Sequence, residues 1–203
     1  YSGYHKAIRN ANEQRVSQKK SLIINANCNA HARRYFFKTR DKYPEANYYL
    51  EIYQKIYTLH IESKCKPPDE ILKYRLQMQV HFESMRNCAM EELVRYPKGN
   101  QYEKALNYFL NNYIGLTIFL KDADVDIDNN AQERLLRSHV VGRKTWYGTH
   151  SEQGAETAAI LFSIVETCKL NGVNPREYFP DLIKDLLDRK KPYTPEQWLL
   201  QKT

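Results

Sequence analysis

Apolar residues recur at helical spacing through the middle of this 203-residue chain, and that pattern constrains the fold more than any other feature. From residue 49 onward they fall at i, i+3, i+4, i+7 and i+10, which places on one helix face Tyr49, Ile52, Tyr53, Ile56 and Leu59. Similar runs continue to about residue 120, and only seven glycines and eight prolines are available in the whole chain to interrupt them. The sequence therefore predicts a mainly α fold.

One segment departs from the helical pattern. Ser21–Cys28 is a short apolar run rich in β-branched residues, which is typical of a strand. We expect one or two strands in all, with a short helix over residues 4–12 before this segment and a basic helix after it. The stretch Val140–Gly154 contains three glycines and predicts a loop or a short hairpin.

Positive charge is concentrated near the N-terminus. The chain has 31 Lys and Arg against 24 Asp and Glu, a net charge of +7, and residues 1–43 alone contain ten basic and two acidic residues. Such a local field suits an anionic partner, either nucleic acid or an acidic membrane surface, and a solvated basic face is the simpler alternative. No run approaches the roughly 20 apolar residues of a membrane span, and we expect no membrane partner.

Four cysteines are scattered along the chain without paired spacing: Cys28, Cys65, Cys88 and Cys168. We interpret them as reduced thiols of a cytoplasmic protein. Cys28 and His31 have the spacing of half a zinc site. No second half follows at a usable distance, so zinc is not expected.

Glu133 is the residue with the sharpest choice of roles. Asn130 and Glu133 match a capping box, in which the glutamate would accept the backbone amide of Asn130. Glu133 also precedes Arg137 by about one helical turn, a spacing that stabilises a helix. On these rules alone Glu133 is a structural residue.

The residues that follow Glu133 favour a functional interpretation. Trp146 and four cations come soon after it, the cations being Arg134, Arg137, Arg143 and Lys144. Arginine binds phosphate oxygens through two parallel hydrogen bonds, and tryptophan stacks on unpaired bases. A carboxylate among such cations would repel DNA unless it held a divalent metal, for which Mg²⁺ is the typical ion.

Four motifs occur in order along the chain: Cys28–Phe36, Asp128–Arg137, Gly142–Trp146 and Glu166–Gly172. Through them the chain closely resembles, over roughly residues 1–188, the C-terminal part of the insertion-sequence-66 family of bacterial transposases. The family pattern is Asp-Asn-Asn-x-x-Glu-Arg-x-x-Arg followed by Gly-Arg-Lys-x-Trp. Asn29 departs from the tryptophan that is usual in the first motif, a change expected to have little consequence.

The resemblance implies a DNA transposase with an acidic triad, Asp-Asp-Glu, in a ribonuclease-H-like α/β core. Glu133 matches the family's glutamate, which would be a catalytic ligand of two Mg²⁺ (or Mn²⁺) ions that serve DNA cleavage and strand transfer. Tyr1–Tyr4 match the end of the motif that follows the second aspartate, so both aspartates are expected upstream of Tyr1. We interpret the acidic linker after residue 121 as turn-forming rather than as a source of substitute ligands. The chain is thus expected to be the C-terminal portion of the catalytic domain, carrying a helical insertion, and to be inactive alone.

The resemblance also implies contacts with double-stranded DNA, both transposon ends and target. Arg134 and Arg137 are expected to hold phosphates, with surface salt bridges as the alternative. A DNA-end contact loop is expected from Arg143, Lys144 and Trp146. A core anchor is the alternative role for Trp146. A second DNA-contacting group is His31, Arg33 and Arg34. A structural hydrogen bond is the alternative role for His31.

Four segments are expected. Residues 1–43 end the ribonuclease-H-like core, 44–121 form the helical insertion, 122–188 hold the glutamate helix and the closing helices, and 189–203 form a tail. Expected partners beyond DNA are further copies of the chain and accessory proteins, in a bacterial cytoplasm near the nucleoid. Two other interpretations stay open: a non-catalytic DNA-binding remnant of a transposase, and a module whose residues 44–121 dimerise.

Overall fold

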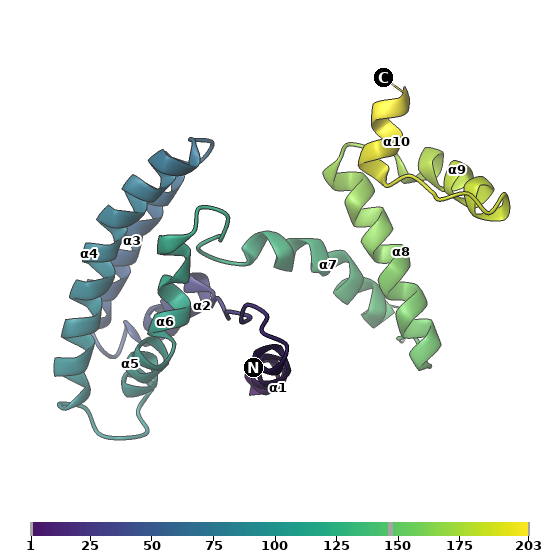
Figure 1. Ribbon diagram of the computed structural model, residues 1–203. Coiled ribbons are helices and arrows are strands. Elements are labelled where there is room, and N and C mark those ends of the chain that lie inside the picture. Colours follow the sequence, from purple (N-terminus) through teal and green to yellow (C-terminus); the bar gives the residue numbers. More distant parts are fainter. Residues whose placement is uncertain (1, 146–147, 203) are drawn as a thin grey trace. The chain divides into compact units, whose positions relative to one another are not determined.

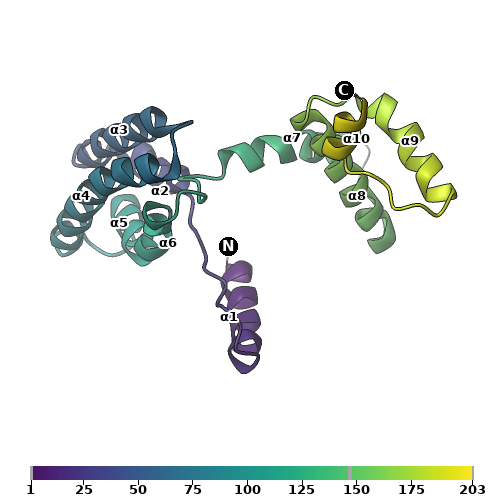
Figure 2. The same cartoon turned by 45° about the horizontal axis from the view of Figure 1, so that its top comes forward.

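The structure is a computed structural model that describes residues 2–145 and 148–202 (Figures 1 and 2). The chain is mainly helical, as predicted, and it divides into two compact units, Tyr1–Asn130 and Ala131–Thr203. The first unit contains α1 (Ser2–Ser17), α2 (Asn29–Thr39), α3 (Ala46–Ser63), α4 (Pro68–Leu93), α5 (Gln101–Asn111), α6 (Tyr113–Thr117) and the 3-10 helix η1 (Ile118–Lys121). From the junction onward follow α7 (Asn130–Thr145), α8 (Glu152–Leu170), α9 (Pro175–Leu187) and α10 (Pro195–Lys202).

The strand predicted over Ser21–Cys28 is not formed, and no strand occurs anywhere in the described ranges. Ile23 instead exchanges two hydrogen bonds with the side chain of Asn12 on α1, donating to Oδ1 at 2.8 Å and accepting from Nδ2 at 2.9 Å. Asn27 N–H donates to the Gly115 carbonyl at 2.9 Å. A strand requires a neighbouring strand to take up its backbone groups, and here a side chain and a helical carbonyl do so.

Aromatic side chains form the core of the first unit. Phe36 of α2 stacks on Tyr49 of α3 with ring centroids 4.2 Å apart, and both rings meet Phe109 of α5 edge-on. The hydroxyls of Tyr49 and Tyr102 donate to Glu92 Oε2 at 2.8 and 2.5 Å. The core thus joins α2 to the helices that follow it, with α3 and α4 running side by side as a hairpin (Figure 1).

A buried arginine fixes the last loop of the first unit. Arg75 of α4 is 3% exposed, and its guanidinium donates to four backbone carbonyls, those of Phe119, Asp122, Ala123 and Val125. Burial lowers the pKa of Arg75, and the carboxylates of Asp126, Asp122 and Asp124 oppose that effect. The arginine therefore holds in place the segment that leads from η1 towards the start of α7.

The second unit has a small core of its own, formed by Cys168, Val173, Tyr178 and Trp198. Gly172 has a φ of +66° and follows the end of α8, a position that favours glycine, while Val173 N–H donates back to the Cys168 carbonyl at 2.8 Å. Trp198 Nε1 donates to Asp181 Oδ2 at 2.8 Å, so the C-terminal helix α10 is tied to α9.

Two predicted boundaries are wrong. Part of the loop predicted over Val140–Gly154 is helical, because α7 continues through Gly142 to Thr145 and α8 begins at Glu152. One glycine costs a helix interior only about 1 kcal/mol, too little to end it among residues that favour helix. The first helix is longer than residues 4–12 and spans Ser2–Ser17.

Candidate functional site

The turn before α7 is held by hydrogen bonds from the side chains of Tyr57 and Asn29. Asp128 Oδ1 accepts the Asn130 backbone amide at 3.0 Å, and Asp128 Oδ2 accepts the Tyr57 hydroxyl of α3 at 2.9 Å. The carbonyl of Ile127 accepts both the backbone and the side-chain N–H of buried Asn29, each at 3.1 Å. The turn that ends at Asn130 is therefore fixed to α2 and α3 within the first unit.

Glu133 lies exposed in the first turn of α7. The helix begins at Asn130, one position earlier than the capping box requires, and the Asn130 amide hydrogen is donated to Asp128 Oδ1. Asp128 thus performs the capping that the sequence pattern assigns to Glu133. The interpretation of Asp128 as a turn former is confirmed, and so is that of Asp122, whose Oδ1 accepts the Asp124 amide at 3.0 Å.

The four predicted cations after Glu133 are all exposed on α7: Arg134, Arg137, Arg143 and Lys144. At 3.6 residues per turn, Glu133, Arg137 and Lys144 fall on the same face of the helix. Arg143 and Lys144 occupy its last turn, where cations are favoured by the helix dipole, rather than the loop that the sequence predicts. Trp146 lies outside the described residues.

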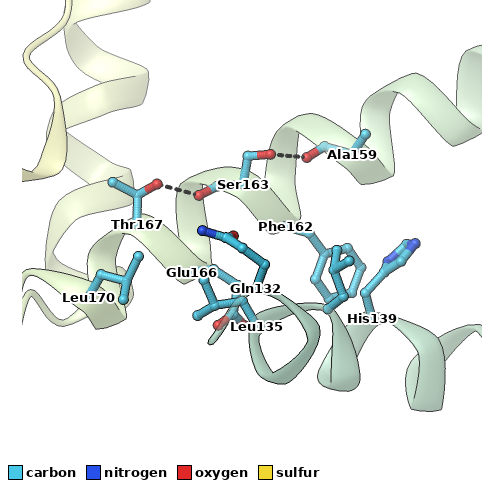
Figure 3. A pocket seen from close by; sticks show the side chains of 10 residues that line it. Gln132, Leu135, His139, Ala159, Phe162, Ser163, Glu166, Thr167 and Leu170 are labelled. Carbon is cyan, nitrogen blue, oxygen red and sulfur yellow. Dashed lines mark hydrogen bonds between the residues drawn. The ribbon is translucent and has the colours of Figure 1, made fainter. Parts of the chain in front are cut away.

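Another face of α7 packs against α8 around a cavity of about 410 Å³ (Figure 3). The His139 and Phe162 rings meet there edge to face with centroids 4.4 Å apart. At the rim, Glu166 accepts Ser138 Oγ–H at 3.0 Å and pairs with Lys169 at 2.6 Å, and the hydrogen bond from Lys169 is the main reason that its pKa is lowered. The walls are mostly apolar, so this cavity is part of the packing between α7 and α8, and Glu133 does not line it.

The second predicted group lies on α2, in the first unit. Arg33 and Arg34 line an open groove of about 620 Å³ between α2 and α3, whereas half-buried His31 is not part of its lining. The remaining lining residues are Ala30, Phe37, Lys38, Gln54, Tyr57 and Asn130. The groove therefore brings together two of the predicted DNA-contacting residues, while Glu133 and the other predicted cations belong to the second unit.

The described residues of this chain do not complete the expected two-metal site. Within residues 2–145 and 148–202, no three His, Cys, Asp or Glu side chains come close enough to hold a metal ion. A two-ion site requires several carboxylates, of which Glu133 is expected to be only one.

Sequence inspection missed several residues of these sites. Lys38 follows Arg34 by one turn of α2, so helical spacing alone would have found it. Gln54 and Tyr57 reach the same groove from α3, which only the tertiary fold reveals. Asn29, expected to matter little, is fully buried and donates to the carbonyls of Leu116 and Ile127.

Comparisons with known proteins place this geometry in context. Residues 1–157 match a family model described as "Transposase IS66 family". The chain is 29% identical over 189 residues to the uncharacterized protein y4hP of Sinorhizobium fredii (strain NBRC 101917 / NGR234), covering 85% of this chain and 34% of that protein. It is 26% identical over 163 residues to the uncharacterized protein y4jD of the same organism, covering 79% of this chain and 32% of that protein.

The chain thus spans about a third of the length of the curated relatives it matches. No solved structure matches it. In the part of the chain that the structure describes, none of the helices combines the length and apolarity needed to cross a membrane.

Proposed function

Because this chain belongs to the IS66 family of transposases, we propose that it is part of a DNA transposase in which Glu133 is one of the catalytic carboxylates. The proposed activity, cleavage of DNA at the ends of an insertion sequence and transfer of the freed strand to target DNA, belongs to the complete protein. In that protein this chain would complete a ribonuclease-H-like core whose Asp-Asp-Glu triad takes its two aspartates from another part of the polypeptide.

The observation that best supports this role is that Asp128, rather than Glu133, accepts the Asn130 amide at the start of α7. Glu133 lies in the first turn of α7, and the turn before the helix is bonded to Tyr57. A carboxylate placed in this way can be positioned accurately towards a metal ion, which catalysis by metal ions requires.

The cations of α7 would hold the phosphate backbone of double-stranded DNA near that carboxylate. Arg137 and Lys144 share the face of Glu133, and Arg134 and Arg143 extend the positive surface on either side. Guanidinium groups bind phosphate through two hydrogen bonds, whereas lysine acts as a point charge. We assign Trp146 to the same DNA-end contact. On α2, Arg33 and Arg34 would contact DNA, with His31 beside them.

The proposed metal is Mg²⁺ or Mn²⁺, two ions in the complete enzyme. Residues of this chain alone do not fit such a pair, since the described part offers no cluster of three ligating side chains. No reaction step is therefore assigned to this chain by itself, and we propose that the isolated chain does not cleave DNA. Metal-dependent cleavage of a transposon-end duplex by this polypeptide alone would contradict that proposal.

The test of the proposed function is metal-dependent nicking of the element's terminal DNA by a longer polypeptide that joins this chain to the segment with the two aspartates. Glu133→Gln keeps the size of the side chain and removes its charge. Loss of nicking with unchanged folding and DNA binding supports the proposal, and retained nicking contradicts it.

A second candidate function is self-association through α4. Four apolar side chains on one face of this helix and its C-terminal cap are 53–89% exposed: Leu76, Val80, Met90 and Val94. They form two apolar pairs on this face, with Glu83 and Asn87 between them. Exposed apolar patches are typical of protein interfaces, and a second copy of the chain is the proposed partner. Light scattering would then show a dimer that Leu76→Glu with Val80→Glu converts to a monomer.

A further inference from the structure

Helix α2 has two distinct faces. One face is buried in the aromatic core and consists of Asn29, Ala32, Phe36 and Thr39. The neighbouring face lines the groove at i, i+3, i+4, i+7 and i+8 and consists of Ala30, Arg33, Arg34, Phe37 and Lys38. Because the buried face fixes the rotation of the helix, the groove face is held in a set orientation beside α3.

The groove is positively charged. Arg33, Arg34 and Lys38 line it, and no carboxylate is among its described lining residues. None of the three cations forms a salt bridge with a carboxylate in the described ranges. Three cations along one wall of an open groove attract a ligand with several negative charges, such as a phosphodiester backbone.

The groove also presents aromatic and amide groups. Phe37 is 43% exposed within it, and the Arg40 guanidinium lies 4.0 Å from the centre of the Phe37 ring. Tyr57 on the opposite wall is fixed by its hydrogen bond to Asp128, and the Gln54 amide can both donate and accept hydrogen bonds. An exposed ring beside cations is the combination on which unpaired bases stack.

We propose that the groove between α2 and α3 binds single-stranded DNA, with phosphates on Arg33, Arg34 and Lys38 and a base on Phe37. This rests on the proposed function in taking DNA as the substrate, and it adds that the bound form is unpaired. In a duplex the bases are stacked on one another, so an exposed phenylalanine would have nothing to bind. Single strands of this kind are produced when the end of an element is nicked and opened.

The test measures the anisotropy of a labelled oligothymidine and of a blunt duplex of equal length, titrated with the full 203-residue chain in EDTA. Wild type is expected to bind the single strand more tightly than the duplex. Arg33→Gln with Arg34→Gln and Lys38→Gln should weaken single-strand binding at least about tenfold. Phe37→Leu keeps an apolar side chain and should weaken it about tenfold, with little effect on the duplex.

The matched control removes three exposed lysines of the same unit that lie outside the groove, Lys73, Lys98 and Lys104. That triple Gln variant lowers the net charge equally and should keep the preference for single strands. Helical circular dichroism confirms that each variant is folded. Equal losses in both triple variants, or an unchanged affinity of the groove variant, would overturn the proposal.

Two further outcomes would identify a different occupant. If the duplex binds as tightly as the single strand and Phe37→Leu has no effect, the groove binds only backbone phosphates and the single-strand assignment fails. If polyglutamate displaces the oligonucleotide at equal charge concentration, the groove is an acidic-protein site and the proposal also fails. Binding in EDTA requires neither a metal ion nor Glu133. A failed nicking test would therefore leave the single-strand binding result standing, and failed single-strand binding would leave the nicking result standing.

Discussion

The hydroxyl of Tyr57 donates to Asp128 Oδ2 at 2.9 Å, which joins α3 to the turn from which α7 starts. Burial, followed by the negative charge of Asp128, raises the pKa of Tyr57, so the phenol stays protonated and remains a donor. The other oxygen of the same carboxylate accepts the Asn130 amide at 3.0 Å. A residue of α3 thus bonds to the turn that precedes α7, within the first unit.

Tyr57→Phe removes this donor and keeps the ring. We expect a loss of about 1 kcal/mol in the free energy of unfolding, since a half-buried carboxylate loses one of its two partners. Tyr48→Phe is the matched control, because its hydroxyl bonds to Ser84 Oγ at 2.7 Å on an exposed surface and its loss should cost less. Urea unfolding followed by circular dichroism measures the free energy of unfolding of both variants. Equal losses would show that the hydrogen bond to Asp128 stabilises the fold no more than the exposed one to Ser84.

Arg75→Lys should destabilise the first unit by roughly 3 kcal/mol, because an ammonium cannot reach all four carbonyls that the guanidinium satisfies. Arg86→Lys is the control, as Arg86 is exposed and lies over the Tyr113 ring with 5.0 Å between them. The same urea titration applies. A change of less than about 0.5 kcal/mol for Arg75→Lys, the range of ordinary surface substitutions, would contradict the role of this arginine.

Much of the helical architecture follows from local sequence. Asn100 caps α5 by accepting the Glu103 amide at 2.7 Å, Asn174 caps α9, and Gly172 ends α8, each at the position that its residue type predicts. These features depend on neighbours a few residues apart. Whether Ser21–Cys28 forms a strand could not be predicted in the same way. A strand requires a partner strand, and none occurs among the described residues.

The candidate sites were only partly predictable for the same reason. The pattern around Glu133 identified both of its possible roles, but the residue that caps Asn130 is Asp128, whose position is set by Tyr57 from 71 residues away. On α2 the sequence indicated Arg33 and Arg34. Their groove exists only because Gln54 and Tyr57 of α3 form its other wall.

Acid should release the C-terminal helix. The pKa of Asp181 lies below its ordinary value because Trp198 Nε1 donates to it and Lys202 bonds to it. A depressed folded-state pKa gives stability that is present above the ordinary value of 3.8 and lost as the pH falls through the folded-state value. In a Trp146→Phe background, Trp198 fluorescence should therefore change in this acid range. The same transition in Asp181→Asn would contradict the assignment to Asp181.

The α7 cations should contribute to duplex binding by charge. Arg137→Gln with Lys144→Gln is expected to lower the affinity for duplex DNA and to reduce the slope of log affinity against log salt by about 2, one for each lost phosphate contact. Lys184→Gln with Lys191→Gln removes the same charge from exposed positions outside α7 and should leave the slope nearly unchanged. Equal slopes for the two pairs would show that α7 makes no specific phosphate contacts.

The most direct test of the central claim compares Glu133→Gln with Glu152→Gln in a longer polypeptide that includes the two proposed aspartates. Both glutamates are exposed and lie in the first turn of a helix, so the two substitutions make the same chemical change in similar surroundings. The measurement is nicking of the element's terminal DNA in Mg²⁺ or Mn²⁺, with DNA binding and helical content checked in parallel. We predict that Glu133→Gln abolishes nicking and that Glu152→Gln retains it. Nicking by Glu133→Gln at the wild-type rate would contradict the account and leave Glu133 a structural residue of α7.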